Sequence, residues 1–188
     1  MRPLYLGSPF DLKTTISPAG IASYLLIVLP LAWLAAKLNG LTTGPALLTG
    51  ALSSAVIFIS DWLHQLGHAR AARRVGYPMI GIHYYSLFSA SIYPADEPSL
   101  PPEIHIRRAL GGFWVNVLIG LVLAPAAIIL WPRGGALGWL AGFSSAYNLF
   151  VNGLGALLPI DIPGVFTIDG GTLLRYWRES RARERRSG

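Results

Sequence analysis

The sequence predicts an all-α membrane protein with about four transmembrane helices and a small β-hairpin on the cytoplasmic side. Of its 188 residues, 53% are hydrophobic and only 13% are charged, which is half the charged fraction of a typical soluble domain. Mean hydropathy is +0.49, and four uncharged stretches of 23 to 27 residues divide the chain. These observations exclude an ordinary soluble globule and a disordered chain. The absence of cysteine also excludes a thiol nucleophile and thiolate metal sites.

Each uncharged stretch is long enough to cross a bilayer as a helix, which takes about 20 residues for a hydrocarbon core of roughly 30 Å. We expect transmembrane helices at about 17–37, 45–72, 108–131 and 135–158, within a single membrane-embedded domain covering residues 1–188. Pro30 and Pro125 lie inside two spans, where neighbouring helices can satisfy the freed carbonyl groups.

Basic residues set the predicted orientation, because cytoplasmic segments beside membrane spans are enriched in Lys and Arg. Only Lys37 and Arg133 lie on one side of the predicted spans, whereas the other 13 of the 15 basic residues lie on the opposite side. We therefore expect an integral, multi-pass protein with both termini and the central loop facing the cytoplasm. The basic tail 175–188 carries no nucleic-acid recognition motif. Its expected partner is the anionic surface of the lipid bilayer and not a nucleic acid.

The central loop contains a short β pattern. Pro78–Pro94 reads PMIGIHYYSLFSASIYP, rich in Ile, Tyr and Phe and bounded by prolines. Two strands with a turn near Ser86–Ala90 are expected. Such strands can offer main-chain hydrogen bonds to an extended peptide, and a hairpin that rests on the membrane surface is the alternative.

Ionisable residues cluster at the end of the second predicted span, where residues 61–68 read DWLHQLGH. Such residues are costly inside a membrane helix and therefore mark candidate functional sites. His64 and His68 are four residues apart, so they share one helix face and can bind Zn²⁺ through two imidazoles. Asp61 lies one turn earlier and is expected to orient an imidazole. Two histidines that only pack against neighbouring helices are the alternative.

Asp169 is the natural third ligand. It follows the fourth span in the segment LLPIDIPGVFTIDGG, and two glycines after it allow a sharp backbone turn. The predicted topology returns Asp169 to the side of His64 and His68, with a fourth ligand position left for water. Alone, Asp-Gly-Gly is a weak turn signal.

Three amides at membrane depth are candidate supporting residues: Asn116, Asn148 and Asn152. Asn148 and Asn152 are four residues apart and are expected to share a helix face. They can line the site, orient a substrate carbonyl or steady the ligand loop. Ordinary hydrogen bonding between membrane helices is the alternative.

With these motifs the chain resembles the site-2 proteases, a family of intramembrane zinc metalloproteases. HQLGH is similar to the family's H-E-x-G-H, LLP…IDGG to its Leu-Pro and Asp-Gly motif, and GGFWVN at 111–116 to its Gly-Pro-x-x-Asn. The opening LGSPFDLKTTISP resembles the strand-like lead-in of compact members. The resemblance implies zinc held by His64, His68 and Asp169. It also implies hydrolysis of peptide bonds in a transmembrane or membrane-adjacent peptide substrate.

Three features depart from the family pattern. Phe113 replaces a usual Pro, the interval from Pro159 to Asp169 is longer than in compact members, and Gln65 replaces the general base Glu of the zinc motif. A neutral amide can orient a water molecule but cannot accept its proton. General acid–base catalysis contributes about 10²–10⁴-fold. We therefore expect a metalloprotease scaffold that retains zinc, with turnover impaired by Gln65.

Several explanations of Gln65 remain open at this point. It can be native, in a catalytically silent pseudoprotease that binds membrane partners, or it can have been introduced to trap substrate or stop self-cleavage. Another carboxylate, Asp61 or Asp161, can instead replace the base, although a base must reach the attacking water. A small transporter fits less well, because the sequence lacks a repeated pair of broken helices.

Overall fold

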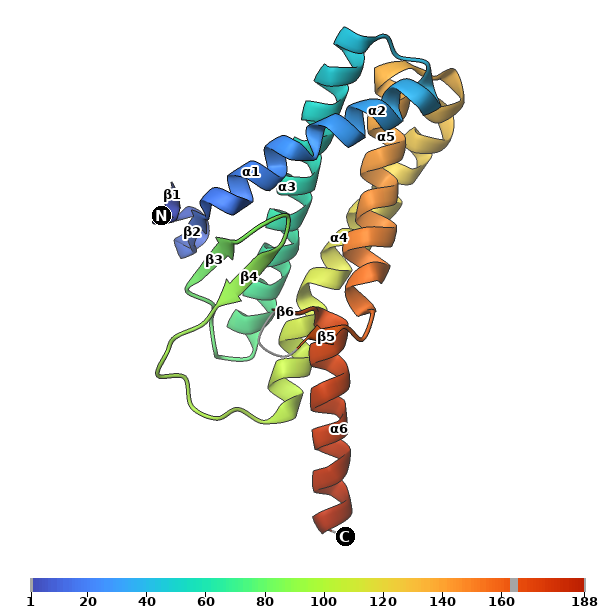
Figure 1. The fold of residues 1–188 in the computed structure, drawn as a ribbon. Helices are drawn as coiled ribbons and strands as arrows, with labels where there is room; N and C mark the ends of the chain where they lie inside the picture. Colours follow the sequence, from blue (N-terminus) through green and yellow to red (C-terminus); the bar gives the residue numbers. More distant parts are fainter. Residues whose placement is uncertain (1, 163–165, 188) are drawn as a thin grey trace.

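The computed structural model describes residues 2–162 and 166–187. Met1, residues 163–165 and Gly188, the last residue of the predicted tail, lie outside the described residues. Most of the described chain is helical, and a small sheet packs beside the lower half of the long helix α3 (Figure 1). Three helical segments are long and apolar enough to cross a membrane, namely Pro18–Asn39, Thr43–Arg74 and Pro102–Arg133. The predicted fold class is confirmed.

The first apolar segment is interrupted once. It consists of α1 (Pro18–Leu26) and α2 (Val28–Asn39), which are separated at Ile27. Pro30 has no N–H to donate to the carbonyl of Leu26, so the regular helical ladder is interrupted there. Ser17 caps α1 by accepting a hydrogen bond from the N–H of Gly20 at 2.9 Å.

The second and third apolar segments are α3 (Thr43–Arg74) and α4 (Pro102–Leu130), which a short 3₁₀ turn, η2 (Trp131–Arg133), extends. At 32 residues, α3 is about 48 Å long. A bilayer core of roughly 30 Å therefore leaves about a dozen of its residues outside the core. The two helices cross with their backbones in contact, because a Cβ atom on Gly67 would overlap the carbonyl of Gly111.

The fourth predicted span is a continuous helical path and not one regular α-helix. The α-helix α5 (Gly135–Ala146) continues as a π-helix, η3 (Tyr147–Gly153), and ends in a 3₁₀ turn, η4 (Leu154–Leu157). The side chain of Asn148 donates to the carbonyl of Ser144 at 2.9 Å. That carbonyl would accept the backbone N–H of residue 148 in an α-helix, so the side chain competes with the regular ladder. Asn148 is buried in this turn, whereas Asn152 is partly exposed.

The predicted hairpin is present and belongs to a larger sheet. Strands β3 (Gly81–Tyr84) and β4 (Ser89–Ile92) pair antiparallel. Strand β2 (Lys13–Ile16) runs parallel to β3, and β1 (Leu4–Gly7) pairs antiparallel with β2. The sheet order is therefore β1-β2-β3-β4, with β4 at an edge. A 3₁₀ turn, η1 (Pro9–Asp11), connects the first two strands.

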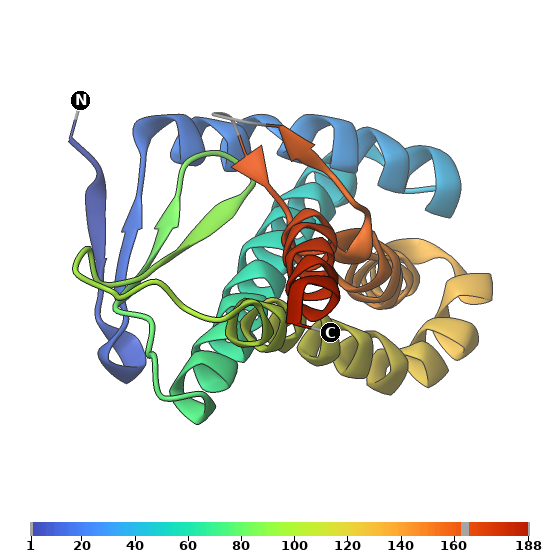
Figure 2. The ribbon, with the colours of Figure 1, turned by 90° about the horizontal axis from the view of Figure 1, so that it is seen from below.

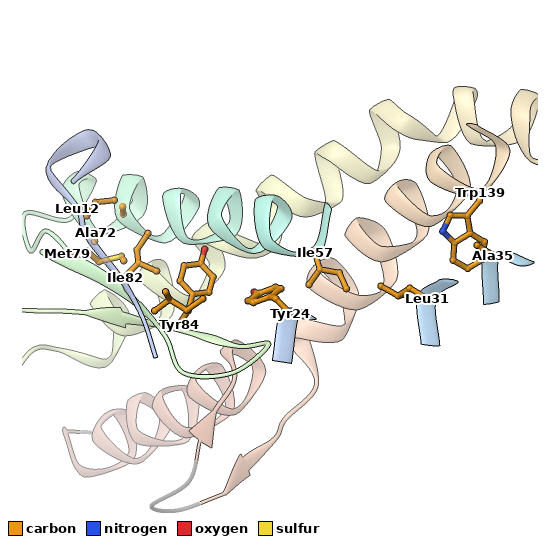
Figure 3. Close-up of a cluster of buried hydrophobic side chains, with 12 residues drawn as sticks. Leu12, Tyr24, Leu31, Ala35, Ile57, Ala72, Met79, Ile82, Tyr84 and Trp139 are labelled. Atoms are coloured by element: carbon orange, nitrogen blue, oxygen red, sulfur yellow. The ribbon is translucent and has the colours of Figure 1, made fainter. Parts of the chain in front are cut away.

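The buried apolar core runs from the sheet along the inner faces of the helices (Figure 3). Ile82 and Tyr84 of β3 are fully buried. Aromatic rings continue this packing into the helices, because Phe58 of α3 lies 4.8 Å from Tyr84 and 5.4 Å from Tyr24 of α1 between ring centroids. The sheet is thereby fixed against the helix that carries the two histidines.

The chain ends in a short hairpin and a helix. Strands β5 (Asp161–Ile162) and β6 (Phe166–Thr167) precede α6 (Asp169–Ser187), which includes the described part of the basic tail. Seen from below, α6 is viewed along its axis and lies beside the start of α4 (Figure 2). The rings of His105 in α4 and Tyr176 in α6 stack with centroids 3.9 Å apart. This contact packs α6 against α4 about two turns after Asp169.

Candidate metal centre

The three predicted ligands lie together, although more than 100 residues separate Asp169 from the histidines in the sequence. His64 Nε2 is 2.9 Å from His68 Nε2 and 3.1 Å from Asp169 Oδ2. His68 Nε2 is 3.3 Å from Asp169 Oδ1. Neighbouring ligands of a tetrahedral zinc ion, with bonds of about 2.0–2.1 Å, lie about 3.3 Å apart. The spacing of this donor set therefore fits one small cation.

The other ring nitrogen of each histidine faces a hydrogen-bond acceptor. His64 Nδ1 is 2.8 Å from Asn116 Oδ1, and His68 Nδ1 is 2.8 Å from the carbonyl oxygen of Arg108. An acceptor oxygen requires a proton on the nitrogen that faces it, so both neutral rings carry their proton on Nδ1. The Nε2 lone pairs then point at each other and at a carboxylate. This arrangement suits a cation and is unfavourable without one.

A polar network inside the bundle fixes the orientation of Asn116. Its Nδ2 donates to Asn148 Oδ1 at 2.7 Å and to the Ser60 carbonyl at 3.3 Å, so its Oδ1 is the atom left for His64. Asn148 in turn donates to the Ser60 hydroxyl at 2.9 Å. Asn116 and Asn148 are 0% and 1% exposed, so they support the site from behind and do not line it. Only Asn152 of the three predicted amides borders the adjacent cavity.

Gly112 provides the space that the ring of His64 occupies. A Cβ atom at this position would lie within 2.6 Å of three His64 ring atoms, including Nε2. The neighbouring Gly111 has a different role, because its added Cβ would meet the backbone of Gly67 on α3. One glycine therefore permits the helix contact, and the next permits the ligand geometry.

Asp169 reaches the histidines because the start of α6 is packed closely against the chain that follows η4. A Cβ atom on Gly170 would overlap the carbonyl oxygens of Leu157 and Leu158, and one on Gly171 would overlap that of Ile160. The two glycines thus serve close packing inside the first helical turn. In the metal-free centre, burial raises the pKa of Asp169, whereas positive charge on the imidazoles of His68 and His64 would hold that pKa well below its usual value. A bound cation would supply the positive charge beside the carboxylate in place of the imidazoles.

Gln65 lies beside this centre and is held by the edge strand β4. Its Nε2 donates to the hydroxyl of Ser89 at 2.8 Å, and the hydroxyl of Ser91 donates to its Oε1 at 2.7 Å. The Ser89 hydroxyl also interacts with the carboxylate of Asp61. Asp61 therefore differs from its predicted role, since Asn116 and Arg108 take the Nδ1 protons that it was expected to accept.

A cavity of about 950 Å³ opens beside the three candidate ligands. Strand β4 borders it with Ser89, Ala90 and Ser91, and the π-helical turn borders it with Phe150, Val151 and Asn152. Leu158 and Ile160 add apolar surface. Candidate ligands at one side of a mostly apolar cavity are typical of an enzyme or binding site for a substantial organic ligand.

The comparisons with known proteins agree with this architecture. No protein-family model matches the chain, and the curated proteins contain no match. Among solved structures, the chain is similar to "Site-2 Protease from Methanocaldococcus jannaschii" with a TM-score of 0.62 and 20% sequence identity. The match covers 95% of this chain and 73% of that one. The chain therefore has the site-2 protease fold, and the predicted resemblance is confirmed at the level of the fold.

Gly112→Ala is predicted to weaken metal binding without loosening the bundle. The three atoms nearest to the added methyl group all belong to the His64 ring, so the imidazole has to move while the contact between Gly67 and Gly111 remains. We expect zinc affinity to fall at least tenfold, measured by competition with a chromophoric chelator, with little change in the melting temperature of the metal-free protein. Gly44→Ala is the control, because a Cβ atom at Gly44 meets nothing within 4 Å. Unchanged zinc affinity in Gly112→Ala would contradict this view of the site.

Proposed function

We propose that this chain is a site-2-type intramembrane zinc metalloprotease with turnover impaired by Gln65. The observation that carries the proposal is the convergence of two imidazole Nε2 atoms and one carboxylate within 3.3 Å, with both Nδ1 protons donated elsewhere. Two nitrogen ligands and one oxygen ligand are a donor set typical of catalytic zinc. When bound, zinc would supply an activated water molecule and polarise a carbonyl group.

The proposed substrate is an extended peptide segment from within or beside the membrane. The edge strand β4 borders the cavity and, among the residues that the structure describes, pairs on one side only, with β3. Its free edge can therefore align a peptide through main-chain hydrogen bonds, which recognise no particular sequence. The apolar side chains of Phe150, Val151 and Leu158 suit an apolar segment.

Gln65 determines how far the reaction can proceed. In a zinc peptidase, the group at this position takes a proton from the attacking water and passes it to the leaving amine. The amide of Gln65 can donate to or accept from a water molecule, but it has no basic site for the proton. The chain can therefore bind and orient a peptide in this cavity, while the proton-transfer step loses its base.

We further propose the orientation and extent of the unit. The ends of α2 and η2 carry Lys37 and Arg133. The opposite end of the bundle carries the metal centre and α6, whose arginines form the basic tail 175–188. The positive-inside bias then puts the termini and the metal centre toward the cytoplasm. Residues 1–188 act as one membrane-embedded domain, and lipid surrounds its apolar helices.

A catalytically silent pseudoprotease that binds membrane partners in the same cavity is the alternative. One observation favours it, because Ser89 and Ser91 occupy both ends of the Gln65 amide. The glutamine is thus well accommodated where it is. The two functions differ in whether a carboxylate at position 65 restores hydrolysis.

The purified protein is predicted to contain about one zinc ion per chain. His68→Ala and Asp169→Ala should each lose most of it, because each variant removes one of three ligands. Elemental analysis of detergent-solubilised protein after dialysis measures the zinc content. His83→Ala is the matched histidine control, since His83 lies on β3, where its Nδ1 is 2.8 Å from the hydroxyl of Thr15. A zinc-free parent protein would overturn the proposed metal centre.

Gln65→Glu is predicted to raise cleavage of a transmembrane reporter by about 10²–10⁴-fold. The hydroxyl of Ser91 already donates to Oε1 at this position and can donate equally to a carboxylate. The cleavage products are measured by gel electrophoresis and mass spectrometry in proteoliposomes.

The control for this gain is the double variant Gln65→Glu with Asp169→Asn, which should remain inactive because its metal ligand is impaired. A parent protein that already cleaves at the rate of Gln65→Glu would refute the role given to Gln65. A Gln65→Glu variant that binds zinc but does not cleave would favour the pseudoprotease.

A further inference from the structure

Arg108 is a buried cation in the second turn of α4, only 4% exposed. Its Nη1 donates to Glu97 Oε2 at 3.0 Å, and its Nη2 donates to Glu97 Oε1 and, at 2.6 Å, to the carbonyl oxygen of Tyr77. The guanidinium also lies 4.1 Å from the centre of the Tyr93 ring. A buried charge with this many partners has one fixed position.

The partners of Arg108 come from three separate parts of the connection between α3 and α4. Tyr77 follows the end of α3, Tyr93 follows β4, and Glu97 precedes α4. A single side chain therefore ties the whole connection to the start of α4. The N-cap residue of α4 is Pro101, whose side chain cannot cap the helix. The hydrogen bonds of Arg108 therefore hold the start of α4 in place of a cap.

The backbone of Arg108 is connected to the metal centre. Its carbonyl oxygen accepts the Nδ1 proton of His68 at 2.8 Å. Arg108 thus contacts α3 through its carbonyl group and the residues just after α3 through its guanidinium. Displacement of Arg108 would move the acceptor that orients His68.

We propose that Arg108 and Glu97 form a latch that positions His68: their paired side chains hold the start of α4 so that the Arg108 carbonyl keeps the imidazole proton on Nδ1 and Nε2 free for a metal. Both are positioning residues, since they act through His68. The consequence for metal affinity rests on the proposed zinc site, whereas the consequence for the histidine ring does not.

The charges of the pair matter as well as its geometry. Hydrogen bonds from Arg108 hold the pKa of Glu97 below its usual value, so the carboxylate balances the buried guanidinium at neutral pH. Removing one partner leaves an uncompensated charge, which is costly in a buried position. An unpaired Arg108 cation near the centre would also oppose the binding of a metal cation.

The test measures zinc affinity and the state of the His68 ring in the full-length protein in detergent. Glu97→Gln and Arg108→Lys should each lower zinc affinity by about 10–100-fold, the range typical for loss of a group that orients a metal ligand. In metal-free protein labelled with ¹⁵N-histidine, the Nδ1 shift of His68 should be that of a protonated nitrogen in the parent and should show partial loss of this proton in the two variants. The chain has only four histidines, which makes assignment practicable.

Glu179→Gln is the matched control, because Glu179 forms an exposed pair with Arg175 on α6 at 3.8 Å. It should leave both readouts unchanged. The melting temperature of each metal-free variant identifies any that fail to fold. Arg108→Lys retains the charge and most of the stem, so it remains informative if Glu97→Gln unfolds.

Folded latch variants with zinc affinity within threefold of the parent and an unchanged His68 ring would overturn the latch. A parent protein that binds no zinc would instead overturn the proposed function. The ring measurement in the metal-free protein would then still decide whether Arg108 and Glu97 position His68.

Discussion

The close crossing of α3 and α4 is the contact on which the candidate metal centre depends. Gly67 and Gly111 have no Cβ atoms, so the two backbones touch at this point. The same approach places Gly112 beside the ring of His64 and brings Asn116 Oδ1 and the Arg108 carbonyl within 2.8 Å of the two Nδ1 atoms. A larger residue at the crossing would separate both histidines from their acceptors at once. Helix packing and ligand orientation are therefore one constraint in this protein.

The polar groups inside this apolar bundle all need hydrogen-bond partners, because a buried polar group without a partner is costly. The amide of Asn116 is satisfied by His64, Asn148 and Ser60, and the amide of Asn148 distorts the fourth helical segment into a π-turn as it bonds to Ser144. Partial loss of such a network leaves donors and acceptors unpaired in a low-dielectric interior. The irregular turn therefore carries the amide that holds Asn116, and the same turn borders the cavity.

The sequence was sufficient to predict the apolar helices, the hairpin and the grouping of His64, His68 and Asp169, because each rests on a local pattern or on membrane sidedness. The sequence was insufficient to predict which residues hold the candidate ligands in their orientation. Asp61 was expected to orient an imidazole because it is one turn away, but the acceptors come from α4, and no local spacing encodes a contact between two helices. Arg108, the first residue of the predicted third span, enters the sequence-based prediction only through the count of basic residues that sets the orientation. Arg108 directly precedes an uncharged stretch, and this position was the one feature of the sequence that indicated a buried and paired charge.

The hydrogen bonds of Gln65 show how its surroundings accommodate an amide at this position. Gln65 donates to the Ser89 hydroxyl, which leaves the proton of that hydroxyl for the carboxylate of Asp61. A glutamate would remove the first donor, and two carboxylates would then compete for one hydroxyl proton. Ser91, which donates to Oε1, would hold either side chain equally well. Ser91 can therefore donate to either a glutamine or a glutamate at position 65, whereas the bond with Ser89 requires the amide. Under the proposed function, the loss of turnover follows from this one group, whereas the three candidate ligands and the acceptors of their Nδ1 protons are already in place around it.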